Sequence, residues 1–291
     1  MSKEIDNPIF VIGTGRSGTT IFYKLLSEHP NVAWSSHLCN FFPNSLYLQR
    51  ALMHTVDIPL LGDVAKKVFK PVEVYKFWDY YFAGFSLPYR DLKAEDLSYK
   101  IKRDLNRPMP QLVTNKRYRL IHKITGWSRV GMLSKAFTNA KFIHIIRDGK
   151  AVTNSMLNVK FWNGWQGPNK WLYGSMPDKY LEIWNEYEQS FVALASLQWI
   201  MLMDSTKEAL SKIDSNRVLE IRYEDLCTDK VEKMKEVLKF CDLEQNSKYF
   251  KKIQNIELIN RNDKYKTDLT QEQQNIMIEI LQKKLIEWGY E

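Results

Sequence analysis

The sequence has few cysteines and no long uninterrupted run of apolar residues. Its three cysteines, Cys39, Cys227 and Cys241, are too scattered for a disulfide framework, and no two of them have the spacing of metal ligands. We therefore expect buried thiols in a reducing compartment. The longest apolar stretch, Phe191 to Met203, is interrupted by polar residues and is too short to cross a bilayer.

The amino terminus also lacks the features of a secretory signal. A signal peptide starts with basic residues and continues into a long apolar segment, whereas this chain carries Glu4 and Asp6 there. Internal repeats, low-complexity tracts and Gly- or Ser-rich linkers are missing as well. With 44% hydrophobic residues in 291, the chain is expected to be a soluble, cytoplasmic protein in which residues 1–291 form a single domain.

Charge is distributed unevenly along the chain. Residues 1–150 carry 23 Lys and Arg against 12 Asp and Glu, whereas residues 151–291 carry 19 against 22. A basic excess is usually a solvated surface, but it also attracts anionic ligands. The sequence contains no zinc-finger spacing, helix-turn-helix pattern or RNA-binding signature, so nucleic acid is not an expected partner.

Short apolar segments that alternate with helical patterns predict an α/β fold with a mainly parallel sheet covered on both sides. The expected strands are 8–13, 31–35, 118–123, 141–148 and 217–222, and the expected helices include 21–27, 128–137, 150–157, 180–209 and one that runs from a capping box at Asp229 and Glu232 to Phe240. The aromatic, basic and proline-punctuated segment 41–117 is predicted to be a helical insertion over the sheet.

A glycine-rich loop, Gly13-Thr14-Gly15-Arg16-Ser17-Gly18-Thr19-Thr20, lies between the first strand and the first helix. In that position, backbone N–H groups and the positive end of the helix favour an anion such as phosphate. A dinucleotide site would need an acidic residue at the end of the second strand, but none occurs between Glu28 and Asp57. A nucleoside-triphosphate loop would need lysine where Thr19 stands, so Mg-ATP is disfavoured.

A second anion site is suggested by Arg147, which ends the strand 141–148, and by Ser155 in the following helix. An Arg-Asp pair at a strand end is more often a structural cap. Two anion sites on neighbouring strand-helix turns, however, would suit a nucleoside with phosphates at both ends.

Four segments in order, PIFVIGTGRSGTT, FIHIIRDGKAVTNS, VLEIRYEDL and the closing WGYE, resemble the sulfotransferases that use 3′-phosphoadenylyl sulfate (PAPS). The similarity is closest to the bacterial and tyrosylprotein-type branch with an R-S-G-T-T loop, and it is weakest between about residues 40 and 115. This resemblance implies a P-loop-like three-layer fold. It also implies PAPS as donor, 3′,5′-adenosine bisphosphate (PAP) as product, a hydroxyl acceptor and no metal.

The resemblance also implies roles for individual residues. The loop from Gly15 through Arg16, Ser17, Gly18 and Thr19 to Thr20 would hold the 5′-phosphosulfate, and Arg147 with Ser155 the 3′-phosphate. Tyr223 would lie near the nucleotide. Lys264, in Asp263-Lys264-Tyr265, matches a C-terminal K-W of the family with Tyr in place of Trp.

Two cationic residues are candidates for the transfer step itself. Arg16 is expected to stabilise the leaving phosphate oxygen; the alternative is a contact that only positions the phosphate. Lys123 matches the lysine of the family's K-x-P segment, although Thr125-Gly126 follow here, and it is expected to contact the sulfonate; the alternative is a surface lysine.

A base for the acceptor hydroxyl is less well marked. His37 follows Arg16 by 21 residues, close to where the tyrosylprotein branch has a glutamate, and imidazole titrates near neutrality. His37 is therefore the candidate base, with His122 in reserve, whereas His144 is expected to be a core residue.

Tryptophans are concentrated in the second half of the chain. Trp184 and Trp199 are expected in the core of a long helix. Trp162, Trp165 and Trp171 lie in the loop 161–173, which is predicted to be a lid or an acceptor wall.

The acceptor class stays open among carbohydrate, lipid, natural product and peptide tyrosine. The alternative functions are a Mg-ATP-dependent small-molecule kinase and a nucleotide-binding protein without turnover.

Overall fold

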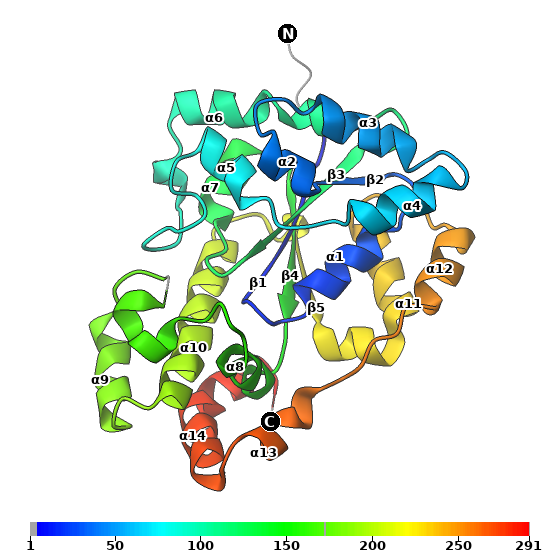
Figure 1. Cartoon of the computed structure of the whole chain (residues 1–291). Helices are drawn as coiled ribbons and strands as arrows, with labels where there is room; N and C mark the ends of the chain where they lie inside the picture. The colour runs from blue at the N-terminus through cyan, green and yellow to red at the C-terminus, as the bar shows by residue number, and fades with distance from the viewer. Residues whose placement is uncertain (1–4, 172, 291) are drawn as a thin grey trace.

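The computed structural model describes residues 5–171 and 173–290 and is organised around a central sheet of five parallel strands (Figure 1). The sheet order is β2-β3-β1-β4-β5. The strands are β1 (Ile9–Gly13), β2 (Val32–Trp34), β3 (Arg119–Thr125), β4 (Lys141–Ile146) and β5 (Val218–Arg222). The expected α/β class is confirmed, and the sheet is parallel at every pairing.

Strand β1 lies between β3 and β4, so the segments that follow these three strands are neighbours. All five residues of β1 are buried, as expected for an apolar strand covered on both faces. Val11 lies opposite Lys123 of β3, and Ile12 opposite His144 of β4. Because the three strands are parallel, the loops at their carboxyl ends meet at one edge of the sheet.

Helices connect the strands and cover the sheet. Those near the site are α1 (Thr19–Ser27), which packs on β1, β2 and β3, and α8 (Gly149–Leu157), which packs on α10 (Phe191–Leu210) and α14 (Gln271–Glu287). The other helices outside the insertion are α7 (Val130–Ala136), α9 (Asp178–Glu186), α11 (Tyr223–Phe240), α12 (Ser247–Gln254) and α13 (Tyr265–Asp268). Asp229 caps a kink inside α11, where its Oδ1 accepts a hydrogen bond from the Glu232 N–H.

The segment between β2 and β3 is helical, as predicted. It contains α2 (His37–Phe41), α3 (Tyr47–Thr55), α4 (Leu61–Val68), α5 (Tyr75–Tyr81) and α6 (Tyr99–Asn106), with short 3-10 turns at Ala94–Asp96 and Met109–Leu112. Gln49 of α3 is buried and donates to the Trp34 carbonyl at the end of β2, while its own carbonyl accepts from the Ser36 hydroxyl. In Figure 1, α2, α3, α5 and α6 gather at one end of the molecule, at the top of the view.

The single helix expected over 180–209 is wrong, because the structure has two helices there. Glu188 and Gln189 have positive φ angles of 51° and 59°, and the Gln189 N–H donates to the Trp184 carbonyl. This left-handed turn ends α9 and separates it from α10. The apolar pattern continues through the break and so conceals it in the sequence.

Trp184 and Trp199 are buried in the cluster around α8, α10 and α14, as expected. A second and larger cluster packs on the sheet. Among the helices of residues 5–171 and 173–290, none is both long and apolar enough to cross a membrane.

Candidate functional site

The glycine loop turns from β1 into α1 with its backbone held from both sides. Gly18, the N-cap of α1, has φ of +92°, a conformation that favours glycine. A Cβ at Gly18 would lie 2.2 Å from Cδ2 of Tyr223, so the tyrosine ring rests on the loop. The Ser17 hydroxyl donates to the Thr14 carbonyl at 2.7 Å, and Gly15 faces Met156 of α8. The loop and the start of α1 therefore pack as one unit, at the position where a strand-helix turn favours an anion.

The two motifs for which anion binding is predicted meet directly. The Nε of Arg16 donates to the Ser155 hydroxyl at 2.9 Å, and an Nη of Arg147 donates to the Arg16 carbonyl at 3.0 Å. The guanidinium of Arg147 also stacks on the Tyr223 ring, 4.8 Å from its centre. Four side chains predicted from separate motifs thus form one cluster at the ends of β1, β4 and β5.

The side chain of Arg147 is oriented by a chain of hydrogen bonds, which we call the Arg147 relay and which the sequence did not predict. Its Nε donates to Oδ1 of Asn262, and Nδ2 of Asn262 donates to Oε1 of Glu224 at 2.5 Å. The other oxygen of Glu224 accepts from the Tyr290 hydroxyl at 2.9 Å. Burial lowers the pKa of the Arg147 guanidinium and raises that of Tyr223 to about 12. Glu224 and Tyr290 lie in the quoted YEDL and WGYE segments, whereas Asn262 carried no sequence signal.

Lys123 projects from β3 to the other side of the glycine loop. Its Nζ donates to Oγ1 of Thr20 at 2.8 Å and lies 3.6 Å from Oε2 of Glu73. The side chain is only 8% exposed, so it is not the surface lysine of the alternative interpretation. Burial lowers its pKa, and the Glu73 carboxylate opposes this shift.

Glu73 is a site residue that the sequence analysis missed. It comes from the helical insertion, just before α5, and its Oε1 accepts from the Thr125 hydroxyl at 2.7 Å and from the Tyr75 hydroxyl at 3.3 Å. Tyr75 in turn donates to the Thr125 carbonyl and accepts from the Thr125 N–H. These contacts fix a half-buried carboxylate beside Lys123. A lone Glu in the segment with the weakest family resemblance gave no indication of this position.

The histidines occupy different environments. His37 is exposed at the start of α2, with its ring near Phe41. His122 is buried among aromatic side chains of the core, including Phe77 and Trp78, and burial lowers its pKa to about 3. His144 is also a buried strand residue, as expected, and its Nδ1 lies 3.2 Å from Oε1 of Glu220.

Lys264 lies two residues from Asn262, in a 3-10 turn, and forms a 3.4 Å ion pair with Asp268. Asp268 also accepts a hydrogen bond from Asn154 of α8. Lys264 is therefore close to the Arg147 relay along the chain, with most of its side chain exposed.

The Trp-rich loop is mainly part of the core. Trp162 donates to Gln198 and Trp171 to the Gly174 carbonyl, and both are buried. Trp165 is 60% exposed, which leaves it as the candidate for contact with an acceptor. Position 172 of this loop lies outside the described residues.

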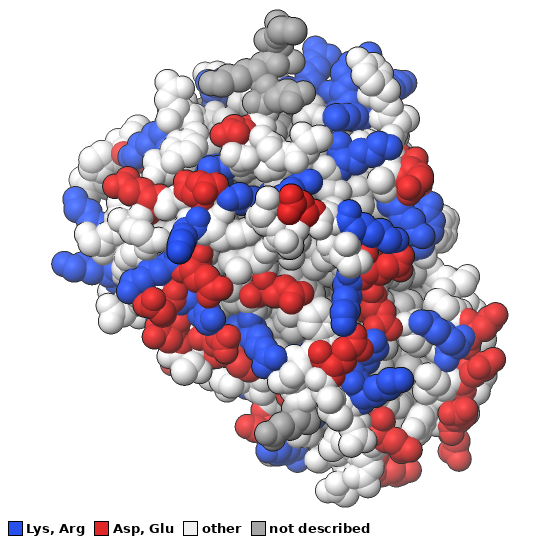
Figure 2. Space-filling model, turned by 180° about the vertical axis from the view of Figure 1, so that it is seen from behind, with Lys and Arg blue, Asp and Glu red and all other residues white. Residues whose placement is uncertain are grey.

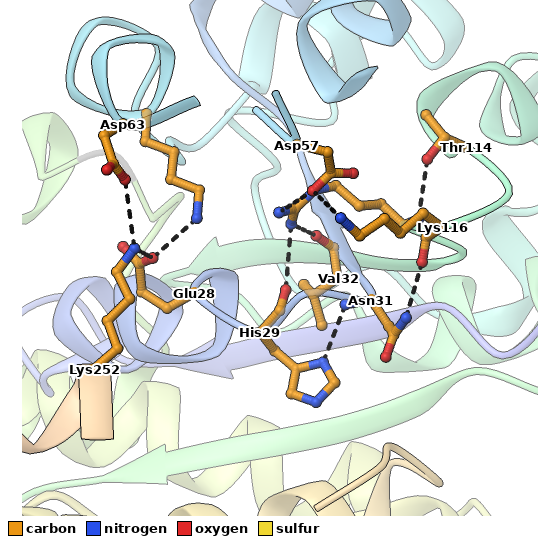
Figure 3. A network of polar contacts seen from close by, with 11 residues as sticks. Glu28, His29, Asn31, Val32, Asp57, Asp63, Thr114, Lys116 and Lys252 are labelled. Atoms are coloured by element: carbon orange, nitrogen blue, oxygen red, sulfur yellow. Dashed lines mark hydrogen bonds and ion pairs between the residues drawn. The ribbon is translucent and has the colours of Figure 1, made fainter. Parts of the chain in front are cut away.

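A cavity of about 930 Å³ opens beside the cluster and extends along the outer face of α1. Arg16, Gly18, Thr19, Arg147 and Tyr223 line one end, and α4 and α12 contribute lysines at the other. This volume suits a nucleotide-sized ligand. At the far end, Oε2 of Glu28 lies 3.2 Å from Nζ of Lys66 and 2.8 Å from Nζ of Lys252. Figure 3 shows Glu28 beside Lys252. Burial tends to raise the pKa of Glu28, but the two lysines lower it overall.

No group of three or more His, Cys, Asp or Glu side chains that could hold a metal ion occurs in the described part of the chain. The charged groups around the loop are mainly cationic: Arg16, Arg147 and Lys123 converge there. Such a set, together with a helix N-terminus, can bind phosphate or sulfonate groups directly.

Known proteins resemble this chain in sequence and in fold. The model of a family described as the sulfotransferase family matches residues 8–247. A search of curated protein sequences found no match.

Among solved structures, a sulfotransferase from Mycobacterium avium is 18% identical with a TM-score of 0.59, over 99% of this chain and 78% of that one. The sulfotransferase domain of the curacin biosynthetic pathway is 15% identical with a TM-score of 0.54, over 99% of both chains. The sulfotransferase domain of the olefin synthase of Synechococcus PCC 7002 is 17% identical with a TM-score of 0.53, over 100% of this chain and 98% of that one. At these identities the structures show a shared fold, and the match of the family model over most of the sequence adds membership: the chain belongs to the sulfotransferase family.

Proposed function

We propose that this protein transfers the sulfuryl group of PAPS to a hydroxyl acceptor and releases PAP. The observation that carries the proposal is the contact of Arg16 with Ser155 and of Arg147 with the Arg16 backbone, at the mouth of a nucleotide-sized cavity. Two phosphate-binding groups, each at its own strand end, match a nucleotide with phosphates on both sides of its ribose.

In this proposal the backbone from Gly15 to Thr20 holds the 5′-phosphosulfate at the start of α1. Arg147 and Ser155 hold the 3′-phosphate, with Tyr223 and Lys264 beside the nucleotide. Asn262 and Glu224 orient Arg147, because a guanidinium bound at its Nε keeps its remaining N–H groups fixed.

Transfer follows an in-line path. The acceptor oxygen forms a bond to sulfur while the bond between sulfur and the bridging 5′-phosphate oxygen breaks, and that oxygen keeps the electron pair. Arg16 stabilises the negative charge that develops on the leaving oxygen, and Lys123 contacts the sulfonate. With cations supplied by side chains, we propose that no metal takes part.

The proton of the acceptor hydroxyl needs a base on the side of Lys123. We propose Glu73 for this role, because its carboxylate lies 3.6 Å from the Lys123 amine and is held by Thr125 and Tyr75. A base must reach the reacting hydroxyl with a fixed geometry. His37, the candidate from sequence, is exposed on α2 and is the alternative that the same assay tests.

Residues 1–291 are proposed to form one sulfotransferase domain, since the alignments with the curacin and olefin-synthase domains extend over 98–99% of those chains. A cytoplasmic location is proposed from the cysteines, of which Cys39 and Cys241 are free and buried.

Calorimetric titration with PAP, with and without Mg²⁺, tests the donor assignment. We expect tight binding that does not depend on metal and that weakens strongly in Arg147→Ala. Preference for Mg-ATP would favour a kinase instead. PAP binding without turnover for any hydroxyl acceptor would favour a nucleotide-binding protein.

A further inference from the structure

Five aliphatic side chains form an exposed ridge on the helical insertion, at the junction of α3 and α4. We call it the α4 ridge. Leu60 is 88% exposed, and the other members are between 47% and 63% exposed: Ile58, Leu61, Val64 and Val68. Single exposed aliphatic residues are common, but a contiguous apolar patch marks an interaction surface.

The packing of α4 turns this ridge outward. Leu61, Val64 and Val68 share one helical face by their spacing. The helix instead buries Gly62 and Ala65, and a Cβ at Gly62 would lie 2.3 Å from the Val56 carbonyl. The small residues therefore face the rest of the protein, and the large aliphatic residues face solvent.

Leu60 extends the ridge into the loop that precedes the helix. Its φ is +66°, a conformation that is unfavourable for leucine. The turn is held by backbone hydrogen bonds from Leu61 to Pro59 and from Gly62 to Ile58, each 2.8 Å long. The α3–α4 loop projects from the edge of the molecule in Figure 1. The fold thus keeps a leucine side chain in water on a strained backbone.

The surface around the ridge is basic. Two half-buried acidic residues near the ridge are ion-paired: Glu28 with Lys66 and Lys252, and Asp57 with Lys116 and Arg117 (Figure 3). Exposed lysines stand at position 67 within α4 and at position 70 just after it, and both also line one end of the cavity, as does exposed Lys24 of α1. The exposed acid Asp63 lies 3.9 Å from Lys252. On the side of the molecule turned away in Figure 1, basic and acidic side chains are interspersed (Figure 2).

We propose that the α4 ridge docks this protein onto the surface of an anionic lipid bilayer. The aliphatic side chains, led by Leu60 and Leu61, would enter the boundary between headgroups and acyl chains, and the lysines would contact anionic headgroups. A second copy of the chain is a poorer occupant, because a symmetric contact through this face would bring the lysines of both copies together. Lys67 and Lys70 also line the cavity, but the aliphatic side chains of the ridge do not, so the inference does not rest on the donor assignment.

Flotation of the whole chain with phosphatidylcholine vesicles, with and without phosphatidylserine, tests this proposal. We expect binding to the phosphatidylserine vesicles that decreases as salt is raised. The double variant Leu60→Ser/Leu61→Ser should reduce the partition coefficient by about tenfold or more, because buried leucine contributes strongly to insertion. Lys67→Gln/Lys70→Gln should reduce it by about tenfold and weaken its salt dependence.

A matched control is Ile278→Ser/Ile286→Ser, which removes two exposed isoleucines from α14 and should leave vesicle binding unchanged. All substituted side chains are at the surface, and thermal unfolding of each variant checks its fold. Absence of binding to phosphatidylserine vesicles at low salt would overturn the proposal, as would an equal loss in the α14 control. A dimer in solution that Leu60→Ser/Leu61→Ser dissociates would identify a second copy as the occupant and would also overturn it.

Discussion

Arg16 and Ser155, which are 139 positions apart in the sequence, are joined by a 2.9 Å hydrogen bond from the arginine Nε to the serine hydroxyl. The bond connects the glycine loop after β1 to the helix after β4, and these strands are neighbours in the sheet. The residue proposed to stabilise the leaving oxygen is therefore held by a residue proposed to bind the 3′-phosphate.

Ser155→Ala should weaken PAP binding by about tenfold, because one hydrogen bond to a charged group is lost both to Arg16 and to the nucleotide. Arg147→Ala should weaken it by about 100-fold. Calorimetry measures both, and Ser211→Ala, at the carboxyl end of α10, is a control that should bind as the parent does. Unchanged affinity in Ser155→Ala would remove Ser155 from the nucleotide site.

Gly18→Ala should lower the free energy of unfolding by more than a glycine-to-alanine substitution that introduces only backbone strain. The new methyl group would meet the Tyr223 ring at 2.2 Å, which adds an overpacking cost of about 1–3 kcal/mol. Gly84 has a similar φ of +84° and open space around it, so Gly84→Ala should cost only about 1 kcal/mol. Chemical denaturation compares the two variants, and equal losses of unfolding free energy would contradict the close packing of Tyr223 on the loop.

Glu73→Gln should lower kcat by at least about 100-fold, as expected for loss of a general base, while PAP affinity changes by less than about twofold. The amide can still accept from Thr125 and Tyr75, so the local geometry should persist. Glu95→Gln removes the same charge from an exposed site in the insertion and should leave kcat unchanged. His37→Asn, assayed beside them, should retain most activity; the reverse ranking would assign the base to His37.

His122 should make the folded state sensitive to acid. Burial lowers its pKa from 6.5 to about 3, so the folded state holds the ring neutral, whereas the unfolded chain takes up a proton below about pH 6.5. Stability from this residue is thus present above pH 6.5 and is lost progressively as the pH falls toward 3. Unfolding free energies at pH 7 and pH 4.5 should differ less in His122→Phe than in the parent, and equal differences would contradict this burial effect.

The parallel sheet and the glycine loop could be predicted from sequence because both depend on local patterns of residues. β1 and β4 are short apolar segments, each followed directly by a loop and a helix. The position of Arg147 could be predicted for the same reason. It directly follows the last residue of β4, and the end of a parallel strand lies at the edge of the sheet where the site is.

Glu73, Asn262 and the break at Glu188 follow from contacts that no local pattern records. Glu73 reaches Lys123 because the insertion folds back over β3, and Asn262 reaches Arg147 across a gap of 115 residues. Trp162 and Trp171 lie in a polar loop, yet each is buried and has an acceptor for its indole N–H. Their burial depends on α10 and on the loop backbone, which the loop composition does not reveal.

The helical insertion leaves the sheet after β2 and rejoins it at β3. The cations proposed for the donor lie elsewhere: Arg16 follows β1, Lys123 is within β3 and Arg147 follows β4. The acceptor side of the site can therefore be altered without changing the residues proposed to hold the two phosphate groups. Exchange of the insertion for that of another member of the family should alter which alcohols are accepted and leave Arg16, Arg147 and Ser155 in place, because these residues lie outside the exchanged segment. A chimera of this kind needs a carboxylate at the position of Glu73, because that side chain is where the exchanged segment meets Lys123.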